Sequence, residues 1–259
     1  MGGVGRRTMT SEVRIIGVAD LPEISPGTDL AEVITTAAQG QGITLTSGDI
    51  LVVTQKIVSK AEGRLVDIHT VTPSAFACQI ARLQEKDPRI MEVVLRETKR
   101  VVKMDQRTVI AETHHGFVCA NAGVDESNVA GEGIVALLPA DADASARRLR
   151  QGIQERLGVE LAVIISDTFG RPWREGLVNV AIGVAGLEPI KDYRGLSDTA
   201  GRVLKVTALA VADELASAAE LVMGKLAKIP VAVIKGYPYP SGEGDVKQLL
   251  RKPEKDLFR

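Results

Sequence analysis

Two aspartates stand in polar segments that adjoin apolar runs, where they could hold a divalent cation. Asp125 lies in the sequence Asn-Ala-Gly-Val-Asp-Glu-Ser-Asn at 121–128, which also carries Asn128, and Asp167 directly follows the apolar run 161–166. Carboxylate, amide and hydroxyl oxygens are the ligands that Mg²⁺ and Mn²⁺ prefer, and Thr168 adds a hydroxyl. Asn, Asp, Ser and Gly also form ordinary turns, so each segment alone is equally compatible with a turn.

Basic side chains follow two other apolar segments. The run 50–54 leads into Gln55, Lys56 and Lys60, and the segment 223–230 carries two further lysines. Ammonium groups beside hydroxyls and backbone N–H groups can hold phosphates. The pattern Gly-x-x-x-x-Gly-Lys is absent, so this is not a Walker loop. The alternatives are a solvated strand end and a helix C-terminus whose lysines complement the dipole.

Other chemistries find little support in the sequence. The three histidines, His69, His114 and His115, do not have the spacing of a zinc site, and no Ser-x-x-Lys or Gly-x-Ser-x-Gly signature marks a nucleophile. Carboxylates for a metal and cations for phosphates remain. This combination indicates metal-dependent phosphoryl transfer from a nucleotide, with the acceptor left open.

The elements that must position these residues alternate irregularly. We predict strands at 13–19, 50–54, 161–166 and 229–234, β-structure across 101–124, and helices at 30–40, from 72, at 90–100, at 145–157 and at 204–223. Because strands and helices mix without a regular βα repeat, we expect an α+β fold of mixed sheets with packed helices. We expect a flexible N-terminus at 1–12, one folded unit at 13–248 in which no subdomain boundary is readable, and a charged tail at 249–259.

Composition narrows the class of protein further. The 259 residues are 45% hydrophobic and 25% charged, the formal net charge is −1, and aromatic residues make up 3%. These values are typical of a globular protein, and the lack of basic excess argues against a nucleic-acid partner. Cys78 and Cys119 lie in apolar runs and are predicted to be buried, reduced thiols. No apolar run is long enough for a membrane span, so we expect a cytoplasmic protein without a membrane partner.

Four segments together resemble a known family, the GTP-dependent coenzyme F420-0:L-glutamate ligases. They are Val-Ser-Lys-Ala-Glu-Gly-Arg at 58–64, Asn-Ala-Gly-Val-Asp-Glu-Ser-Asn-Val at 121–129, Ser-Asp-Thr-Phe-Gly-Arg-Pro-Trp-Arg at 166–174 and Ala-Ile-Gly-Val-Ala-Gly at 181–186. Several long motifs in the family's order are more specific than any one of them. The resemblance runs from about residue 13 to residue 236.

The resemblance implies an activity and an assembly. GTP would phosphorylate the terminal carboxylate of a deazaflavin phospholactate, and L-glutamate would attack the acyl phosphate to form an amide, with further γ-linked glutamates to follow. The resemblance also implies Mn²⁺ or Mg²⁺, allows for a monovalent cation as well, and implies a homodimer with two intertwined subdomains. Residues 13–248 would then form the ligase domain.

Family roles carry over onto matching positions of this sequence. Asp125 and Asp167 would ligate one divalent metal and Thr168 a second, and Asp125, Asp167 and Lys60 would be catalytic. The residues expected to bind GTP are Leu21, Pro22, Glu23, Ile24, Gln55, Lys56, Lys60, Asn128, Met223, Gly224, Lys225, Leu226, Ala227, Lys228 and Ile229. The sequence departs from the family at Lys225, where archaeal-type members carry a metal-binding Glu after Met-Gly.

Two other functions stay open at this point. The departure at Lys225 favours a non-catalytic deazaflavin- or nucleotide-binding protein, whereas Asp125, Asp167 and Lys60 argue against it. Another metal-dependent phosphotransferase would release phosphate without requiring glutamate.

Overall fold

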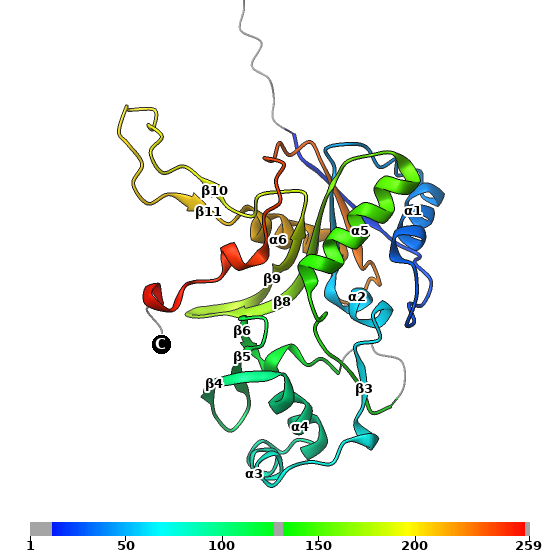
Figure 1. The fold of residues 1–259 in the computed structure, drawn as a ribbon, viewed down its shortest axis with the longest axis vertical. Helices are drawn as coiled ribbons and strands as arrows, with labels where there is room; N and C mark the ends of the chain where they lie inside the picture. Colours follow the sequence, from blue (N-terminus) through cyan, green and yellow to red (C-terminus); the bar gives the residue numbers. More distant parts are fainter. Residues whose placement is uncertain (1–11, 127–131, 257–259) are drawn as a thin grey trace, which may run out of the picture.

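A five-stranded sheet forms the centre of the molecule. The computed structural model describes residues 12–126 and 132–256. The sheet has the order β1 (Arg14–Val18), β12 (Val231–Lys235), β2 (Ile50–Thr54), β8 (Ala162–Arg171) and β9 (Arg174–Ala185). β2 and β8 are parallel, and the other neighbours are antiparallel. The expected α+β class with mixed sheets is confirmed (Figure 1).

Helices cover both faces of this sheet. One face, which includes Leu51 and Val163, packs in a core with α1 (Leu30–Gly40) and α5 (Ala142–Leu157). The opposite face, which includes Val52 and Ile164, packs against α6 (Val211–Met223). Burial on both faces explains why β2 and the first half of β8 are continuous apolar runs rather than alternating ones.

Local capping fixes where the helices begin and end. The Asp29 carboxylate accepts the Glu32 N–H at 3.0 Å at the start of α1, and Asp141 accepts the Ala144 N–H at 2.9 Å at the start of α5. Each bond satisfies a backbone donor that the helix cannot pair internally. Gly158, at a φ of 67°, ends α5 in the left-handed conformation, as its position in the sequence predicts.

A second, smaller layer lies against one end of the sheet and has its own apolar clusters. It contains the antiparallel strands β4 (Thr98–Met104), β5 (Val109–Thr113) and β6 (Val118–Ala120), the helices α3 (Ala75–Gln84) and α4 (Pro88–Glu97), and the strand pair β3 (Leu65–Asp67) and β7 (Ile134–Ala136). Short 3-10 helices span Ile68–Thr70, Asn121–Gly123, Val246–Leu249 and Pro253–Lys255. The β-structure predicted for 101–124 therefore exists, as three strands.

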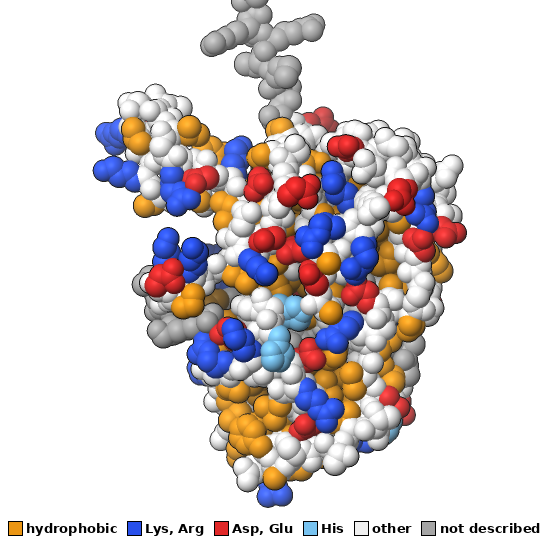
Figure 2. All heavy atoms as spheres, viewed as in Figure 1, with side chains coloured by type: hydrophobic (Ala, Val, Ile, Leu, Met, Phe, Trp, Pro, Cys, Tyr) orange, Lys and Arg blue, Asp and Glu red, His pale blue; other side chains and the backbone are white. Residues whose placement is uncertain are grey.

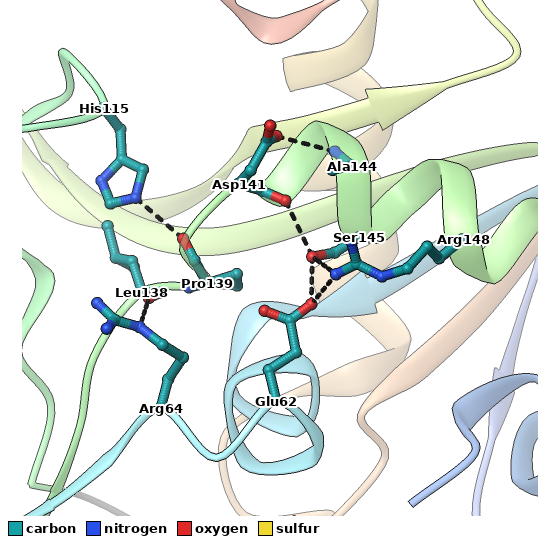
Figure 3. Close-up of polar contacts among 9 residues, drawn as sticks. All are labelled: Glu62, Arg64, His115, Leu138, Pro139, Asp141, Ala144, Ser145 and Arg148. Atoms are coloured by element: carbon teal, nitrogen blue, oxygen red, sulfur yellow. Dashed lines mark hydrogen bonds and ion pairs between the residues drawn. The ribbon is translucent and has the colours of Figure 1, made fainter. Parts of the chain in front are cut away.

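Polar contacts tie the helix α2 (Gln55–Ala61) to α5 (Figure 3). Glu62, directly after α2, accepts hydrogen bonds from the Ser145 hydroxyl and, at 2.5 Å, from the Arg148 guanidinium, both on α5. Arg64 donates to the Leu138 carbonyl at 3.0 Å and pairs with Glu97 of α4 at 3.1 Å. These contacts hold α2, which carries Lys56 and Lys60, against both layers.

Three segments differ from the sequence prediction. The helix predicted for 204–223 begins only at Val211, because the preceding residues belong to an arm formed by β10 (Lys191–Asp192) and β11 (Ala208–Leu209), which projects from the body (Figure 1). Residues 55–61, for which no helix is predicted, form α2. The predicted strand 161–166 starts at Ala162 and continues to Arg171, pairing with β9 in a hairpin that was not predicted.

Gly183 permits the close contact between α5 and the sheet. A Cβ atom at this position would lie 2.4 Å from the backbone carbon of Ala142, at the start of α5. No side chain fits there without moving the helix. Small residues in the segment 181–186 thus have a packing role.

Several smaller expectations can be checked as well. Cys119 is buried as predicted, whereas Cys78 is half-buried, and both are free thiols. Most of the N-terminus expected at 1–12 lies outside the described residues. Within the described ranges, no helix is long and apolar enough to span a bilayer. On the face shown in Figure 2, acidic and basic side chains are interspersed around α5 rather than segregated by sign.

Candidate active site

A cavity of about 920 Å³ opens where β2 and β8 end, between the central sheet and the smaller layer. Its walls come from four segments: residues 21–24, the end of β2 with α2, the segment that includes Asn121 and Asp125, and the β8–β9 hairpin with the segment after α6. The carboxyl ends of parallel strands are a common place for a ligand site in α/β sheets. The four polar clusters of the sequence therefore converge on one cavity.

The carboxyl group of Asp167, in the wall of this cavity, has a raised pKa. The pKa of its carboxyl group is raised to about 6, mainly by burial and also by the negative charge of Asp125, although the Thr168 backbone N–H and the charges of Lys225 and Lys56 act in the opposite direction. Two carboxylates that share a site disfavour each other's ionised form. A cation bound nearby would stabilise the ionised form of this carboxylate.

Asp125 is fixed by the backbone around it. Its N–H and C=O bond to Ala136 at 3.0 and 2.8 Å, and its carboxylate pairs with Lys56 at 2.7 Å. The preceding turn places Asn121 and the buried Ala122 at positive φ angles of 50° and 51°. Such backbone conformations are rare for residues other than glycine, and they concentrate at functional sites.

Two buried oxygens in the cavity wall have no hydrogen-bond partner. They are the Oδ1 of Asn121 and the Oγ of Ser166, in residues that both line the cavity. Buried polar atoms are nearly always paired, so unpaired ones indicate a missing ligand or water. With the carboxylates of Asp125 and Asp167 they form a set of hard oxygen donors, which fits a divalent cation. Among the described residues, no group of three His, Cys, Asp or Glu side chains could hold a metal.

Lys60 lies on α2 in the opposite part of the wall. It is buried, and its ammonium group pairs with the largely exposed carboxylate of Glu23 at 2.5 Å. Gln55, at the first turn of α2, is also buried and accepts a hydrogen bond from Ser59 at 2.8 Å. Because the Glu23 side chain is largely exposed to solvent, Lys60 is well placed to exchange this carboxylate for another anion.

Comparison with known proteins identifies the family. A family model described as F420-0:Gamma-glutamyl ligase matches residues 19–236. The chain is 48% identical over 250 residues to the coenzyme F420:L-glutamate ligase of Methanothermobacter thermautotrophicus, covering 95% of this chain and 99% of the relative. The protein of that name from Methanopyrus kandleri is 45% identical over 242 residues, or 92% and 94% of the two chains. The chain belongs to the F420-0:gamma-glutamyl ligase family. The resemblance inferred from its motifs is confirmed.

The residues carried over from this ligase family can now be located. Those that line the cavity are Leu21, Pro22, Glu23, Ile24, Gln55, Lys56, Lys60, Asp125, Asp167, Thr168, Gly224, Lys225, Leu226, Lys228 and Ile229. Met223 does not line it, because its side chain is fully buried in the core beneath α6. Ala227 is exposed and also lies outside the cavity wall, and Asn128 falls outside the described residues. The ligand roles of all these residues stay predictions.

Two polar residues of the wall, Asn179 and Glu220, lie outside every polar cluster that the sequence analysis singled out. Thr168 donates its hydroxyl hydrogen to Asn179 Oδ1 at 2.7 Å, Asn179 Nδ2 donates to Glu220 Oε2 at 2.8 Å, and the Lys225 ammonium group donates to the Thr168 hydroxyl oxygen. The only signal in the sequence was a lone Asn in the otherwise apolar segment 177–182. Glu220 reads as an ordinary polar position of an Ala-rich helix.

Proposed function

We propose that this protein joins L-glutamate to the deazaflavin phospholactate precursor of coenzyme F420, with GTP as the phosphoryl donor and Mn²⁺ or Mg²⁺ as the cation. Family membership supports glutamate ligation, since the relatives are named coenzyme F420:L-glutamate ligases. The observation that carries the finer proposal is the convergence of Asp125 and Asp167 with Lys56, Lys60 and Lys225 on one cavity. Three negatively charged reactants require such a concentration of positive charge.

The reaction runs in two steps. A carboxylate oxygen of the precursor attacks the γ-phosphorus of GTP, the bond from that phosphorus to the bridging oxygen breaks, and GDP leaves. The amine nitrogen of glutamate then attacks the carbonyl carbon of the acyl phosphate, inorganic phosphate leaves, and the nitrogen gives up its extra proton. A free carboxylate is a poor electrophile, so the acyl phosphate supplies the leaving group that the amide bond requires.

The residues of this chain act by holding charge. Asp125 and Asp167 would hold a divalent cation, which when bound supplies positive charge to the phosphate oxygens. Lys56 and Lys60 would exchange Asp125 and Glu23 for phosphate oxygens as GTP enters. The segment 21–24 lies beside Lys60 in the same wall and would receive the guanosine part. Lys225, held at Thr168, would supply part of the charge of the second cation that the family resemblance implies.

We further propose that a second copy of the chain covers the projecting arm. An isolated two-stranded ribbon is at best marginally stable, and this arm exposes Leu196, Val203 and Val206. The β8–β9 hairpin likewise exposes Trp173 at its turn, by 79% of its surface. Exposed apolar groups gathered on extended elements are typical of an interface. Sedimentation equilibrium should show a dimer that Val206→Asp combined with Leu196→Asp converts to a monomer; a wild-type monomer would contradict this proposal.

Mass spectrometry tests the activity directly. The protein is incubated with the precursor, GTP, Mn²⁺ and glutamate, and we expect the precursor mass to increase by one or more glutamyl units with equimolar GDP and phosphate. Omission of glutamate should prevent stoichiometric phosphate release. GTP hydrolysis that continues unchanged without glutamate would support a different phosphotransferase, and binding without turnover would support a non-catalytic protein.

A further inference from the structure

A chain of four polar side chains crosses the cavity wall from α6 to the segment that follows it. Glu220 on α6 accepts a hydrogen bond from Asn179 Nδ2 at 2.8 Å, and Thr168 donates to Asn179 Oδ1 at 2.7 Å. Thr168 and Asn179 are directly opposite each other on β8 and β9. At the end of the chain, the Lys225 ammonium group donates to the Thr168 oxygen.

The direction of every hydrogen in this chain follows from Glu220. A carboxylate can only accept, so the NH₂ group of Asn179 must face it. The amide oxygen of Asn179 then faces Thr168 and can only accept, so the Thr168 hydroxyl must donate its hydrogen to Asn179. The lone pairs of the Thr168 oxygen are therefore left for the cavity, where a cation is the natural partner.

The surroundings prevent Asn179 from adopting another position. Asn179 is 2% exposed, and its backbone carbonyl accepts the Ser217 hydroxyl at 2.7 Å, so the residue is held between β8 and α6. Only a rotation of its amide group by half a turn remains available. That rotation would present an N–H to Thr168, occupy one of its lone pairs and turn its hydroxyl hydrogen toward the cavity.

We infer that Glu220 is a positioning residue that acts through Asn179 to keep the Thr168 oxygen an acceptor for a divalent cation, which would take the place of the Lys225 ammonium group. This inference rests on the proposed function, since it assigns how one ligand of that site is prepared. The role of Glu220 in this inference is to orient the Asn179 amide group. Its negative charge does not contribute directly to cation binding.

Two substitutions separate orientation from charge. Glu220→Gln removes the charge but keeps an oxygen that accepts from Asn179, whereas Glu220→Leu removes both. We expect Glu220→Leu to raise the Mn²⁺ dissociation constant about tenfold, as loss of a residue that orients a metal ligand commonly does, and Glu220→Gln to stay within about threefold of the wild type. Glu214→Gln and Glu214→Leu, at an exposed position of the same helix, are the matched controls and should change nothing.

The measurement is electron paramagnetic resonance of free Mn²⁺ during titration, with the non-hydrolysable analogue guanosine 5′-(β,γ-imido)triphosphate present. A double-mutant cycle completes it. In an Asn179→Leu background, Glu220→Leu should have no further effect, because the hydrogen bonds that connect Glu220 to Thr168 through Asn179 are already gone. Circular dichroism melting of each variant confirms that it is folded; a variant that fails to fold is replaced by Glu220→Met or Asn179→Met.

The outcomes are distinct. Equal losses in Glu220→Gln and Glu220→Leu would show a direct charge role and overturn the inference, and additive losses in the cycle would do the same. Wild-type protein that binds Mn²⁺ with the analogue, together with unaffected Glu220→Leu, would overturn the inference while leaving the proposed function intact. Wild-type protein that binds no Mn²⁺ would overturn both.

Discussion

The two ends of the central sheet each have a cavity lined by an aspartate. The two aspartates differ in how the protein compensates the charge of the carboxylate. At the end opposite the candidate active site, a cavity of about 710 Å³ is lined by Asp49 and Lys235. Lys235 pairs with the buried Asp49, and Asp49 also accepts the Thr46 N–H at 2.8 Å. At the other end, the pKa of Asp167 is raised to about 6, and the nearby Ser166 Oγ has no partner.

This difference separates a structural charge from a functional one. A buried carboxylate with a matched cation and a backbone donor is satisfied within the protein, and such a pair contributes to folding. A carboxylate whose pKa is raised by burial and by a second carboxylate, next to unpaired oxygens, is only partly compensated within the protein and is a candidate for an external ligand. The predictions below test whether the two ends separate stability from activity in this way.

The largest effect is expected at Asp167. Asp167→Asn keeps the shape of the side chain and removes the ligand charge, so turnover should fall by a factor on the order of a hundred or more. The melting temperature of the metal-free protein should not fall, because a neutral amide is easier to bury than a carboxylate. Steady-state kinetics at saturating Mn²⁺ and calorimetry measure the two quantities. Near-normal turnover would remove Asp167 from the mechanism.

Asp49→Asn should have the opposite pattern of effects, with lower stability and unchanged turnover. It leaves the ammonium group of Lys235 without its carboxylate, so the free energy of unfolding should decrease by about 2 kcal/mol. Turnover per folded molecule should not change. Urea denaturation gives the first quantity. The control is Arg96→Gln, which breaks the pair that the exposed Arg96 side chain makes with Glu92 within α4 and should have a much smaller effect. An activity loss in Asp49→Asn at full folding would refute the separation of the two ends.

Lys60→Ala should weaken GTP binding about tenfold and glutamate binding much less, because Lys60 supplies a point charge to phosphates. Calorimetric titration with each ligand measures this difference. Lys103→Ala removes an exposed lysine of β4, away from the cavity, and serves as the control. Equal losses for both ligands would indicate that Lys60 has a general structural role.

A smaller effect concerns pH in the metal-free protein. The pKa of Asp167 is about 6 in the folded protein, compared with an ordinary value of 3.8 for the unfolded chain. Between pH 3.8 and pH 6, the folded state therefore binds more protons at this residue than the unfolded state does. The contribution of Asp167 to stability therefore increases as pH falls through about 6. Melting curves in EDTA from pH 7 to pH 5 should show this slope in the wild type and lose it in Asp167→Asn. Identical slopes would contradict the raised pKa.

The sequence predicted the apolar strands and the capped helices well, because burial and capping leave local patterns. The run 50–54 and the helix end at residue 157 are examples. It failed where neighbours distant in sequence decide the structure. The Ala-rich pattern from 204 continues the helical period of α6, yet residues before Val211 pair with β10 in the arm.

The candidate site shows the same division. Asp125, Asp167 and Lys60 stand at the ends of apolar runs or inside family motifs, so their types and positions could be read. Glu220 and Asn179 became visible only when β9 and α6 were placed beside Thr168, since nothing in their own segments indicates a shared hydrogen bond. The buried position of Met223 likewise depends on how α6 packs, and the motif does not contain that information.

The unequal lengths of β2 and β8 have a consequence for solvent exchange. β2 pairs with β8 only as far as Ser166, whereas β8 continues to Arg171 with β9 on one side. Among the described residues, no strand is hydrogen-bonded to the other side of β8 beyond Ser166. Peptide amides that point to that open side, next to the aspartate and threonine of the site, should take up deuterium quickly, while those facing β9 are slow. Deuterium uptake along this single strand can therefore report, without any attached probe, when a ligand fills the cavity.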